Sequence, residues 1–414
     1  MMKVFCGFFL ACTVAGAAAQ EHWSAEQIGT LGGWYTSAAA LNDRGEVVGV
    51  SSNVEHDNHA FLYSGGRLHD LGTLGGTASG ATGINNAGQV VGWSFGSDGG
   101  HRAFLYGAGR MQDITPAGVE HAGALAINQR GQVAGWSQTR SADGAVQWRG
   151  FTHSSSTGAT TAIGTLGGAH SHVRAINNTG QVVGESNLSG NGESHAYLHD
   201  GSSMTALGHL GGAQSGATAI NEAGDVVGHA SLPDGEQHAF LWRDGTLTDM
   251  GTLGGTQSRA ADINDRGQAV GHASLAGDET FRAFLFDQGR MTDLGTLGGA
   301  SSQALGINSL GQVVGWAEIG SPAPGETNRH VFFYDNGVMT DLTRWVMRSF
   351  DIVADVDPYS VLLNDVGQVV LSATFHTGDR GLFLLSPAPE PLTYALMLAG
   401  LAALAALRRR QRPG

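Results

Sequence analysis

Cysteine and lysine are almost absent from this chain of 414 residues. Its two cysteines, Cys6 and Cys12, lie near the start, and Lys3 is its only lysine. Charged residues make up 14% of the chain, and the formal net charge is −14. Because a nucleic-acid-binding domain needs a basic surface, this charge balance excludes simple nucleic-acid binding. Beyond Cys12 the chain can form no disulfide, so its fold there must be stabilised by an apolar core. Hydrophobic residues make up 41% of the chain. This content supplies a core and excludes general disorder.

The segment before Gln20 has the pattern of a secretory signal peptide. Lys3 precedes an apolar run, and Ala17 and Ala19 form a small-residue cleavage site before Gln20. We expect cleavage at this site and export across the inner membrane. Leu10 and Ala11 before Cys12 leave a lipoprotein leader as the alternative.

The C-terminal end carries a second address signal. Residues 392–407 contain no charge and predict a short transmembrane helix, and an Arg-rich end follows that should stay cytoplasmic. A plain tail anchor is the simplest interpretation. Together with the "PEP" that precedes the helix, however, this order resembles a PEP-CTERM sorting signal over 387–414. The residues that carry the resemblance are Pro389, Glu390, Pro391, Arg408, Arg409 and Arg410.

That resemblance implies a Gram-negative source, a processing enzyme of the exosortase type as partner, and exopolysaccharide or biofilm surroundings. The protein would be anchored transiently through the helix at 392–407 and then reach the cell surface or the extracellular space. The predicted organisation is therefore a signal peptide over 1–19, a folded body over 20–386 and a sorting signal over 387–414.

The body is built from internal repeats. The pattern "IN-x-x-G-Q-V-V-G" occurs eight times, with glycine always three residues after the asparagine. Its asparagines are Asn42, Asn85, Asn128, Asn177, Asn221, Asn264, Asn308 and Asn364. Asparagine suits the first position of a type I turn and glycine the last, so we expect each asparagine side chain to cap a turn.

Each repeat predicts four antiparallel strands. In one unit these strands are "ATGIN" (81–85), "QVVGWS" (89–94) and "RAFLY" (102–106), and the fourth is represented by "MTDLGTL" (291–297) of a later unit. Small residues at alternate positions of the first strand predict that it lies in a crowded place, around a central axis. Repeats of ~40–50 residues with four strands are typical of propeller blades.

The two ends of the repeat array predict how the ring closes. The last unit stops after its third strand, at 380–385, and the body opens with an unpaired fourth strand, "AEQIGTL" (25–31). Pairing the two would remove exposed sheet edges. We therefore predict an all-β fold, an eight-bladed propeller that is closed by its N-terminal strand.

The pentapeptide "GTLGG" begins at Gly29, Gly72, Gly164, Gly251 and Gly295. It falls where the fourth strand of one unit crosses to the first strand of the next. Paired glycines there allow positive φ and close backbone approach, so we interpret the pentapeptide as the corner between blades.

Over about 25–385 the paired motifs resemble the HAF extracellular repeat family. His59-Ala60-Phe61 and His238-Ala239-Phe240 carry the letters for which the family is named. The resemblance implies an exported bacterial protein and brings no activity with it.

Chemical motifs are scarce. "GWSFG" (92–96) matches a nucleophile elbow, but it overlaps an ordinary repeat strand and lacks the strand-turn-helix context. Histidine or arginine stands two residues before each "HAF" aromatic, which favours a repeated hydrogen bond over a metal cage. Asp351, Asp355 and Asp357 lack the glycine-centred calcium loop. We expect no metal, no cofactor and no catalytic residue.

Function is then expected where the repeat is interrupted. Insertions at 137–148, 317–329 and 344–360 should lie on one face of the disc, because alternate connections in an antiparallel blade emerge on the same side. They bring residue types that are common at binding hot spots, and the candidate ligand-binding residues are Trp148, Arg344, Trp345, Arg348, Asp355, Asp357 and Tyr359. The alternative for Trp345 is that it caps the core of the seventh blade.

These observations predict a non-enzymatic binding or structural protein of the cell envelope or matrix, with exopolysaccharide or a matrix protein as partner. The alternative is a propeller carbohydrate-active enzyme, a glycosidase or lyase. It would need two carboxylates facing a site, for which Asp355 and Asp357 with Arg344 or Arg348 are the nonrepeating candidates. A plain structural spacer is the third interpretation.

Overall fold

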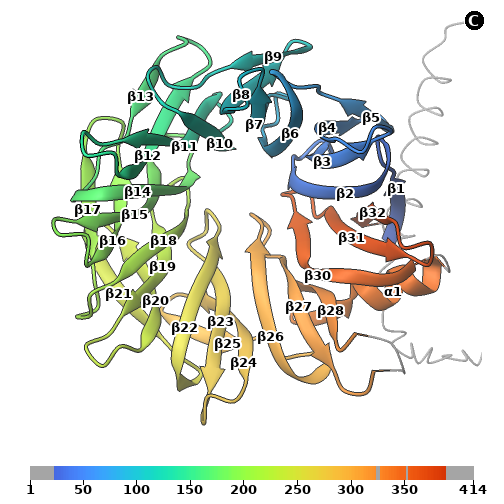
Figure 1. Ribbon diagram of the computed structural model, residues 1–414. Helices are drawn as coiled ribbons and strands as arrows, with labels where there is room; N and C mark the ends of the chain where they lie inside the picture. The colour runs from blue at the N-terminus through green and yellow to red at the C-terminus, as the bar shows by residue number, and fades with distance from the viewer. Residues whose placement is uncertain (1–22, 323–326, 351–352, 388–414) are drawn as a thin grey trace, which may run out of the picture. The chain divides into compact units, whose positions relative to one another are not determined.

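The computed structural model describes residues 23–322, 327–350 and 353–387. Residues 25–385 form one compact unit in which eight four-stranded sheets surround a central opening (Figure 1). The predicted eight-bladed propeller is therefore confirmed. The predicted signal peptide with Ala17 and Ala19, and the sorting signal from 388 onward, lie outside the described residues. Within the described part of the chain, no helix is long and apolar enough to cross a membrane.

Each blade has four antiparallel strands, and in blades 1 to 7 they follow one another in sequence order from the axis outward. The innermost strands are β2 (Gly32–Leu41), β6 (Gly75–Ile84), β10 (His121–Ile127), β14 (Gly167–Ile176), β18 (Ser215–Ile220), β22 (Gly254–Ile263), β26 (Gly298–Ile307) and β30 (Val353–Leu363). The second strands are β3 (Val47–Asn53), β7 (Val90–Gly96), β11 (Gln132–Arg140), β15 (Val182–Leu188), β19 (Val226–Ser231), β23 (Ala269–Leu275), β27 (Val313–Ile319) and β31 (Val369–Phe375).

The third strands are β4 (Asn58–Ser64), β8 (His101–Gly107), β12 (Val146–Ser154), β16 (Ser194–His199), β20 (Gln237–Arg243), β24 (Phe281–Asp287), β28 (Arg329–Asp335) and β32 (Arg380–Pro387). The outer strands are β5 (Arg67–Asp70), β9 (Arg110–Asp113), β13 (Thr160–Ala162), β17 (Met204–Gly208), β21 (Thr246–Gly251), β25 (Arg290–Asp293), β29 (Val338–Asp341) and, for blade 8, β1 (Trp23–Ile28). The predicted closure is confirmed, because β1 pairs with β32.

The core lies between neighbouring blades. The aromatic residue of each third strand is buried there, as Phe61, Phe104 and Phe240 illustrate with no exposed surface. Blade 8 places the equally buried Leu382 at this position. Apolar burial of this kind is the main stabilising term of a chain that lacks disulfides in its body.

The repeated asparagines form a closed ring of hydrogen bonds around the axis. In every blade the asparagine Oδ1 accepts the backbone N–H four residues later, which confirms the predicted turn cap. In every blade its Nδ2 also donates to the backbone oxygen of the next blade's asparagine, at 2.8 to 3.1 Å. The last of these bonds runs from Asn364 to Asn42 and joins blade 8 to blade 1.

The residue four positions after each asparagine is the glutamine of the repeat pattern in most blades, and its contacts explain why it recurs. Its side chain accepts the second hydrogen of Nδ2 in all eight blades, as Gln89 does from Asn85 at 2.9 Å. Both hydrogens of each buried amide are therefore used. The polar groups nearest the axis are satisfied, as buried groups must be.

"GTLGG" is the corner between blades, as predicted. In all five copies the threonine hydroxyl donates to the backbone oxygen of the last glycine, at 2.7 to 3.0 Å. The fourth residue has φ between +102° and +109° in every copy, for example +102° at Gly75. A Cβ on the fifth would lie 2.5 Å or less from its nearest neighbour, for example 2.5 Å from Phe95 Cβ at Gly76. Glycine is therefore required at the fourth residue because of its positive φ, and at the fifth because there is no space for a Cβ.

Some boundaries differ from the prediction. The expected outer strand over 291–297 ends at Asp293, because Leu297 already pairs with Ile319 of the next blade. The insertion at 344–360, which we expected to be a connection, is half helix and half strand. The helix α1 (Leu342–Ser349) begins at Asp341, whose side chain accepts the backbone N–H of Arg344. Such an N-cap stabilises a helix by about 1 kcal/mol.

The inner strands also contain a bulge that the sequence did not reveal. In each of the first seven blades one residue of the inner strand is left without a partner on the second strand, three positions before the asparagine. These residues are Ala39, Thr82, Leu125, Arg174, Thr218, Ala261 and Leu305. Because a bulge re-aims a side chain, this position matters for the site.

The ring of asparagine hydrogen bonds predicts that replacing one asparagine with the isosteric aspartate lowers the stability of the fold. Asn264→Asp keeps the Oδ1 that caps the turn but removes both donors, and it places a carboxylate against the backbone oxygen of Asn308. We expect a loss of roughly 2–4 kcal/mol in unfolding free energy, measured by urea denaturation. The control is Asn58→Asp, an exposed position at the start of β4. Equal stability of the two variants would show that the asparagine serves only its own turn, for which aspartate is equally suited.

Candidate functional site

The predicted ligand-binding residues lie at the ends of the blades from which the insertions emerge. Trp148 is on β12 of blade 3. Arg344, Trp345 and Arg348 are on α1, which contacts β28 and β30. The strand β30 carries Asp355, Asp357 and Tyr359. The structure brings some of these residues together and leaves others apart.

Tyr359 belongs to a layered group with Trp316 and Arg329, which we call the Tyr359 group. The Arg329 guanidinium lies 4.4 Å from the ring centroid of Trp316 and 5.9 Å from that of Tyr359. It also donates a hydrogen bond to the Tyr359 hydroxyl. Trp316 is buried, whereas Tyr359 is 56% exposed. The buried indole and the stacked cation therefore hold an exposed aromatic ring in place.

Asp355 extends this group, and Asp357 supports it. Asp355 Oδ1 accepts the Thr327 hydroxyl at 3.2 Å, so the insertion between β27 and β28 meets β30. Asp357 Oδ1 accepts the backbone N–H of Tyr359 at 3.0 Å. The two carboxylates are two positions apart on one strand, and each already holds a neighbouring group. The facing pair required by a glycosidase is a different arrangement.

The helix α1 contributes mainly to the interior. Leu342, Thr343 and Val346 are buried beneath it, while Arg348 in its last turn is exposed. Arg344 lies 3.8 Å from Asp341, the residue that caps the helix. Trp345 is partly buried, as expected for a side chain at the edge of a core.

Trp148 is in a different place. Its ring lies 5.2 Å from Trp136 in blade 3, and Trp136 lies 6.2 Å from His101 of blade 2. Blades 1 and 2 separate this pair from β30 in blade 8. The seven candidate residues therefore do not form a single cluster: Trp148 lies in blade 3, and the other six lie on α1 and β30.

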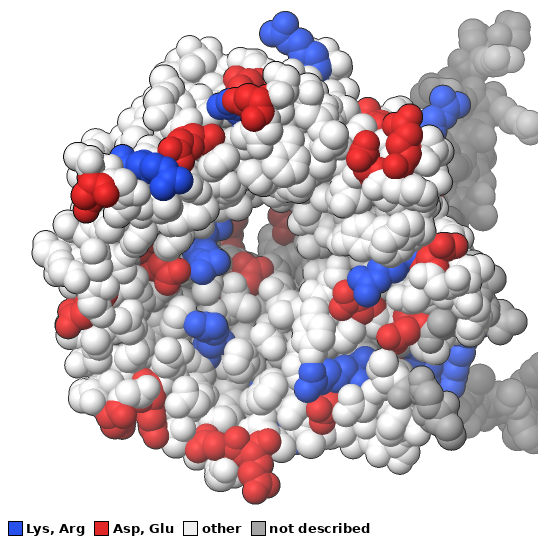
Figure 2. All heavy atoms as spheres, in the orientation of Figure 1, with Lys and Arg blue, Asp and Glu red and all other residues white. Residues whose placement is uncertain are grey.

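A further pocket, which sequence reasoning missed, lies on the inner strands of blades 4 to 6. It has a volume of about 230 Å³ and is lined by Arg174, Glu185, Ala217, Thr218, His229 and Arg259. We call it the axial pocket, because the inner strands β14, β18 and β22 supply most of its lining. Figure 2 shows cationic side chains beside the central opening.

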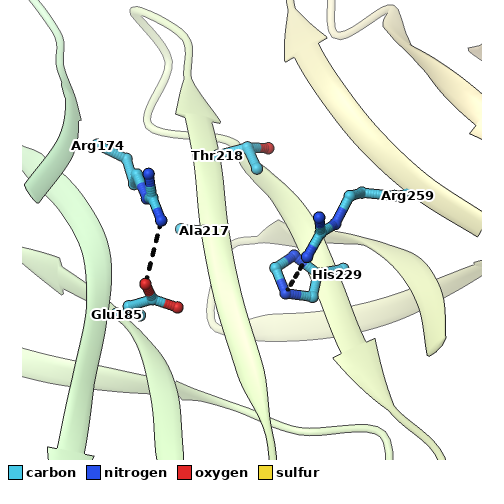
Figure 3. A pocket seen from close by; sticks show the side chains of 6 residues that line it. All are labelled: Arg174, Glu185, Ala217, Thr218, His229 and Arg259. Carbon is cyan, nitrogen blue, oxygen red and sulfur yellow. Dashed lines mark hydrogen bonds and ion pairs between the residues drawn. The ribbon is translucent and has the colours of Figure 1, made fainter. Parts of the chain in front are cut away.

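Two polar pairs face each other across the axial pocket. Arg174 Nη2 lies 3.2 Å from Glu185 Oε1, and Arg259 Nη2 lies 2.8 Å from His229 Nε2. Figure 3 shows these pairs on either side of the strand that carries Ala217 and Thr218. Because His229 Nε2 accepts from a guanidinium, the ring proton must be on Nδ1.

Electrostatics keep His229 neutral. Burial, and next the charge of Arg259, lower the pKa of His229 to about 4. Burial and Arg259 also lower the pKa of His272, on the neighbouring β23, to about 4. At neutral pH the axial pocket thus contains two guanidinium groups and one carboxylate, which leaves an excess of one positive charge.

The signal for this pocket was present in the sequence but not in its insertions. Arg174 takes the bulge position that small or apolar residues occupy in most other blades. Arg259 replaces the Gly80, Gly123 and Gly216 of other inner strands. Interruptions within strands, and not only between them, would have identified the pocket.

Other candidate chemistry is structural. Ser94 of "GWSFG" is buried and accepts the backbone N–H of Leu74 at 2.9 Å. The two "HAF" histidines each bind an aspartate on the outer strand of their own blade, His59 to Asp70 at 2.8 Å and His238 to Asp249 at 2.9 Å. Asp70 in turn accepts the backbone N–H of Gly72, in the corner. In the described part of the chain, no group of three or more His, Cys, Asp or Glu residues is arranged to hold a metal ion.

Comparison with known proteins adds one family, of undefined role. A family described as "Protein of unknown function (DUF3466)" matches residues 249–343. Among curated proteins, none matches this chain.

Several solved structures are similar to this chain at low identity. The acylaminoacyl peptidase of Pyrococcus horikoshii is 10% identical and matches 82% of this chain and 58% of its own, with a TM-score of 0.47. Dipeptidyl peptidase 4 of Porphyromonas gingivalis is 10% identical and matches 81% and 57%, with a TM-score of 0.49. The WD40 domain of SCAP from fission yeast is 11% identical and matches 89% and 99%, with a TM-score of 0.45. This chain spans less than two thirds of either peptidase, and similarity at this level carries no argument about function.

The lowered pKa values predict acid sensitivity. His229 and His272 take up protons more readily in the unfolded chain, with a pKa of about 6.5, than in the folded one. The unfolding free energy should therefore fall as the pH falls from about 6.5 to 4, by at most about 1.4 kcal/mol per pH unit for each histidine. Partial exposure of both rings reduces this slope.

The variant His229→Gln plus His272→Gln should flatten this part of the curve relative to the unmodified chain, because glutamine can still accept from Arg259. The exposed His376→Gln is the control. Burial raises the pKa of Asp262 to about 6, so protonation of Asp262 stabilises the folded chain as the pH falls and opposes the effect of the histidines. The quantity to measure is therefore the difference in unfolding free energy between the unmodified chain and the double variant at each pH. Parallel curves over pH 4–7 would contradict the prediction.

Proposed function

We propose that this protein is an exported propeller of the cell envelope or extracellular matrix that binds exopolysaccharide and performs no catalysis. The observation that carries the proposal is the Tyr359 group. In this group an exposed aromatic side chain, an arginine and a nearby carboxylate lie together on one face of the propeller.

The chemistry of this group suits a sugar polymer. An aromatic face packs against the apolar face of a sugar ring, and a guanidinium pairs with a uronate carboxylate or donates to hydroxyls. Asp355 can accept hydrogen bonds from further hydroxyls. Tyr359 stays exposed although its neighbours Trp316 and Arg329 hold it firmly. A preorganised ring of this kind loses little entropy on binding.

The ends of the chain supply the proposed location. Export through the signal at Ala17–Ala19, and recognition of Pro389–Pro391 with Arg408–Arg410 by an exosortase-type enzyme, would place the propeller outside the inner membrane. Blade closure through β1 and β32 would then keep the body folded after both ends are trimmed. These steps remain proposals, supported by the order of the sequence motifs alone.

The propeller should bind acidic exopolysaccharide on a glycan array through the Tyr359 group. Tyr359→Ala and Arg329→Gln should each weaken binding at least about fivefold, because one removes the exposed ring and the other its cation. Leu310→Ala is the matched control, since Leu310 is 52% exposed in a turn of blade 7 at the opposite end of its strands. Trp345→Ala plus Arg348→Ala tests whether α1 takes part. If both Tyr359-group variants fold and bind every glycan as the unmodified chain does, this face is not the binding site.

A further inference from the structure

The axial pocket has a charge pattern that the fold does not require. Only blades 4 and 6 place arginine on the inner strand at the bulge or two positions before it. Seven of the eight blades close the ring without an arginine at the position of Arg259. The inner strand therefore tolerates small residues here, and the two arginines need another explanation.

Of the two arginines in the axial pocket, one is paired with a carboxylate and the other with a neutral histidine. Arg174 has a carboxylate partner in Glu185, at 3.2 Å. Arg259 donates to the neutral nitrogen of His229, and none of the ion pairs found among the described residues includes it. An exposed guanidinium whose position is fixed by a neutral acceptor keeps most of its donors for a ligand.

Gly216 lies close to both polar pairs, one residue before Ala217 of the pocket lining. A Cβ on Gly216 would lie 3.0 Å from Glu185 Oε2 and 3.0 Å from His229 Cε1, so any side chain there would push the two polar pairs apart. Thr218, at the bulge of the same strand, is held by its hydroxyl against the backbone oxygen of Ala260 at 3.0 Å. Glycine at 216 thus leaves the two polar pairs undisturbed, and Thr218 is joined to the next inner strand.

The mixed charge of the lining selects the ligand class. Two guanidinium groups favour a planar oxyanion such as a carboxylate, which they can bind through paired hydrogen bonds. Glu185 would repel a ligand that is anionic all round, such as phosphate, but it can accept hydrogen bonds from hydroxyl groups. The volume of the pocket, about 230 Å³, suits one small ring. Sites for drug-sized ligands are larger, at roughly 300 Å³ or more.

We propose that the axial pocket binds a single acidic sugar residue, with its carboxylate on Arg259 and Arg174 and its hydroxyls on Glu185. This site is separate from the Tyr359 group: the pocket lies on blades 4 to 6, and the Tyr359 group lies on blades 7 and 8. An acidic sugar monomer, or the end of a chain that enters the central opening, would be the occupant.

The test is isothermal titration of the full chain with galacturonate, galactose and inorganic phosphate. Galacturonate should bind, galactose should bind at least about tenfold more weakly because it lacks the carboxylate, and phosphate should bind more weakly than galacturonate because of Glu185. Arg259→Gln retains a donor for His229 but loses the charge, and it should weaken galacturonate binding about tenfold or more. Arg259→Lys should restore only part of the affinity, because lysine lacks the paired donors.

Arg266→Gln is the matched control, because Arg266 is an exposed arginine in the turn after the same strand and donates only to a backbone oxygen in the next blade. Failure of galacturonate to bind, equal binding of phosphate, or unchanged affinity in folded Arg259→Gln and Arg174→Gln would each overturn the proposal. The titration uses a monosaccharide and other residues than the polymer assay of the Tyr359 group, so either proposal can fail without the other.

Discussion

The ring of eight asparagines around the axis is the interaction on which the rest of this propeller depends. Each side-chain amide uses its oxygen to hold its own turn and its two hydrogens to reach its own second strand and the next blade. No other side chain combines this reach with these donors and acceptors, since aspartate lacks the donors and glutamine is longer. The ring therefore fixes the inner strands of all blades at one end and at one radius. It does so although successive asparagines along the chain are separated by as few as 43 and as many as 56 positions.

Because one end of each inner strand is fixed, variation collects at the other end. There β11 and β12 form a lengthened hairpin, and α1 is inserted between blades 7 and 8. The aromatic groups around Trp148 and Tyr359 are also found there. The bulge three positions before the asparagine in blades 1 to 7 has a similar effect inside the ring, since it offers one position in each of these blades that has no partner on the second strand. Arg174 and Thr218 occupy two of these positions and line the axial pocket.

The electrostatic character of the protein is divided between its surface and its centre. The chain has a net charge of −14, yet the axial pocket carries an excess of one positive charge, because two arginines and one carboxylate line it while His229 is neutral. An acidic exterior favours solubility and discourages adhesion to anionic membranes. A local cationic site in such a protein would attract small anions only at close range, since charges farther apart than about 8–10 Å are screened at physiological salt. A polymer that carries carboxylates could then be held at two separate places, on the Tyr359 group and at the axis.

The sequence by itself determined the number of blades, the closure of the ring by β1 and the role of "GTLGG". Each of these rests on local rules, which are the period of a strand, the turn chemistry of Asn-x-x-Gly and the conformational freedom of glycine. Only the tertiary structure decided which side chains meet. Arg174 and Arg259 are 85 positions apart and line one pocket because inner strands of successive blades lie side by side. Trp148 and Tyr359, both candidate ligand-binding residues, lie in blades 3 and 8. The bond from each asparagine to the next blade also joins residues at least 43 positions apart. The physical reason is that a repeat encodes the geometry of its own blade, whereas contacts between blades depend on the angle and radius at which the whole ring closes.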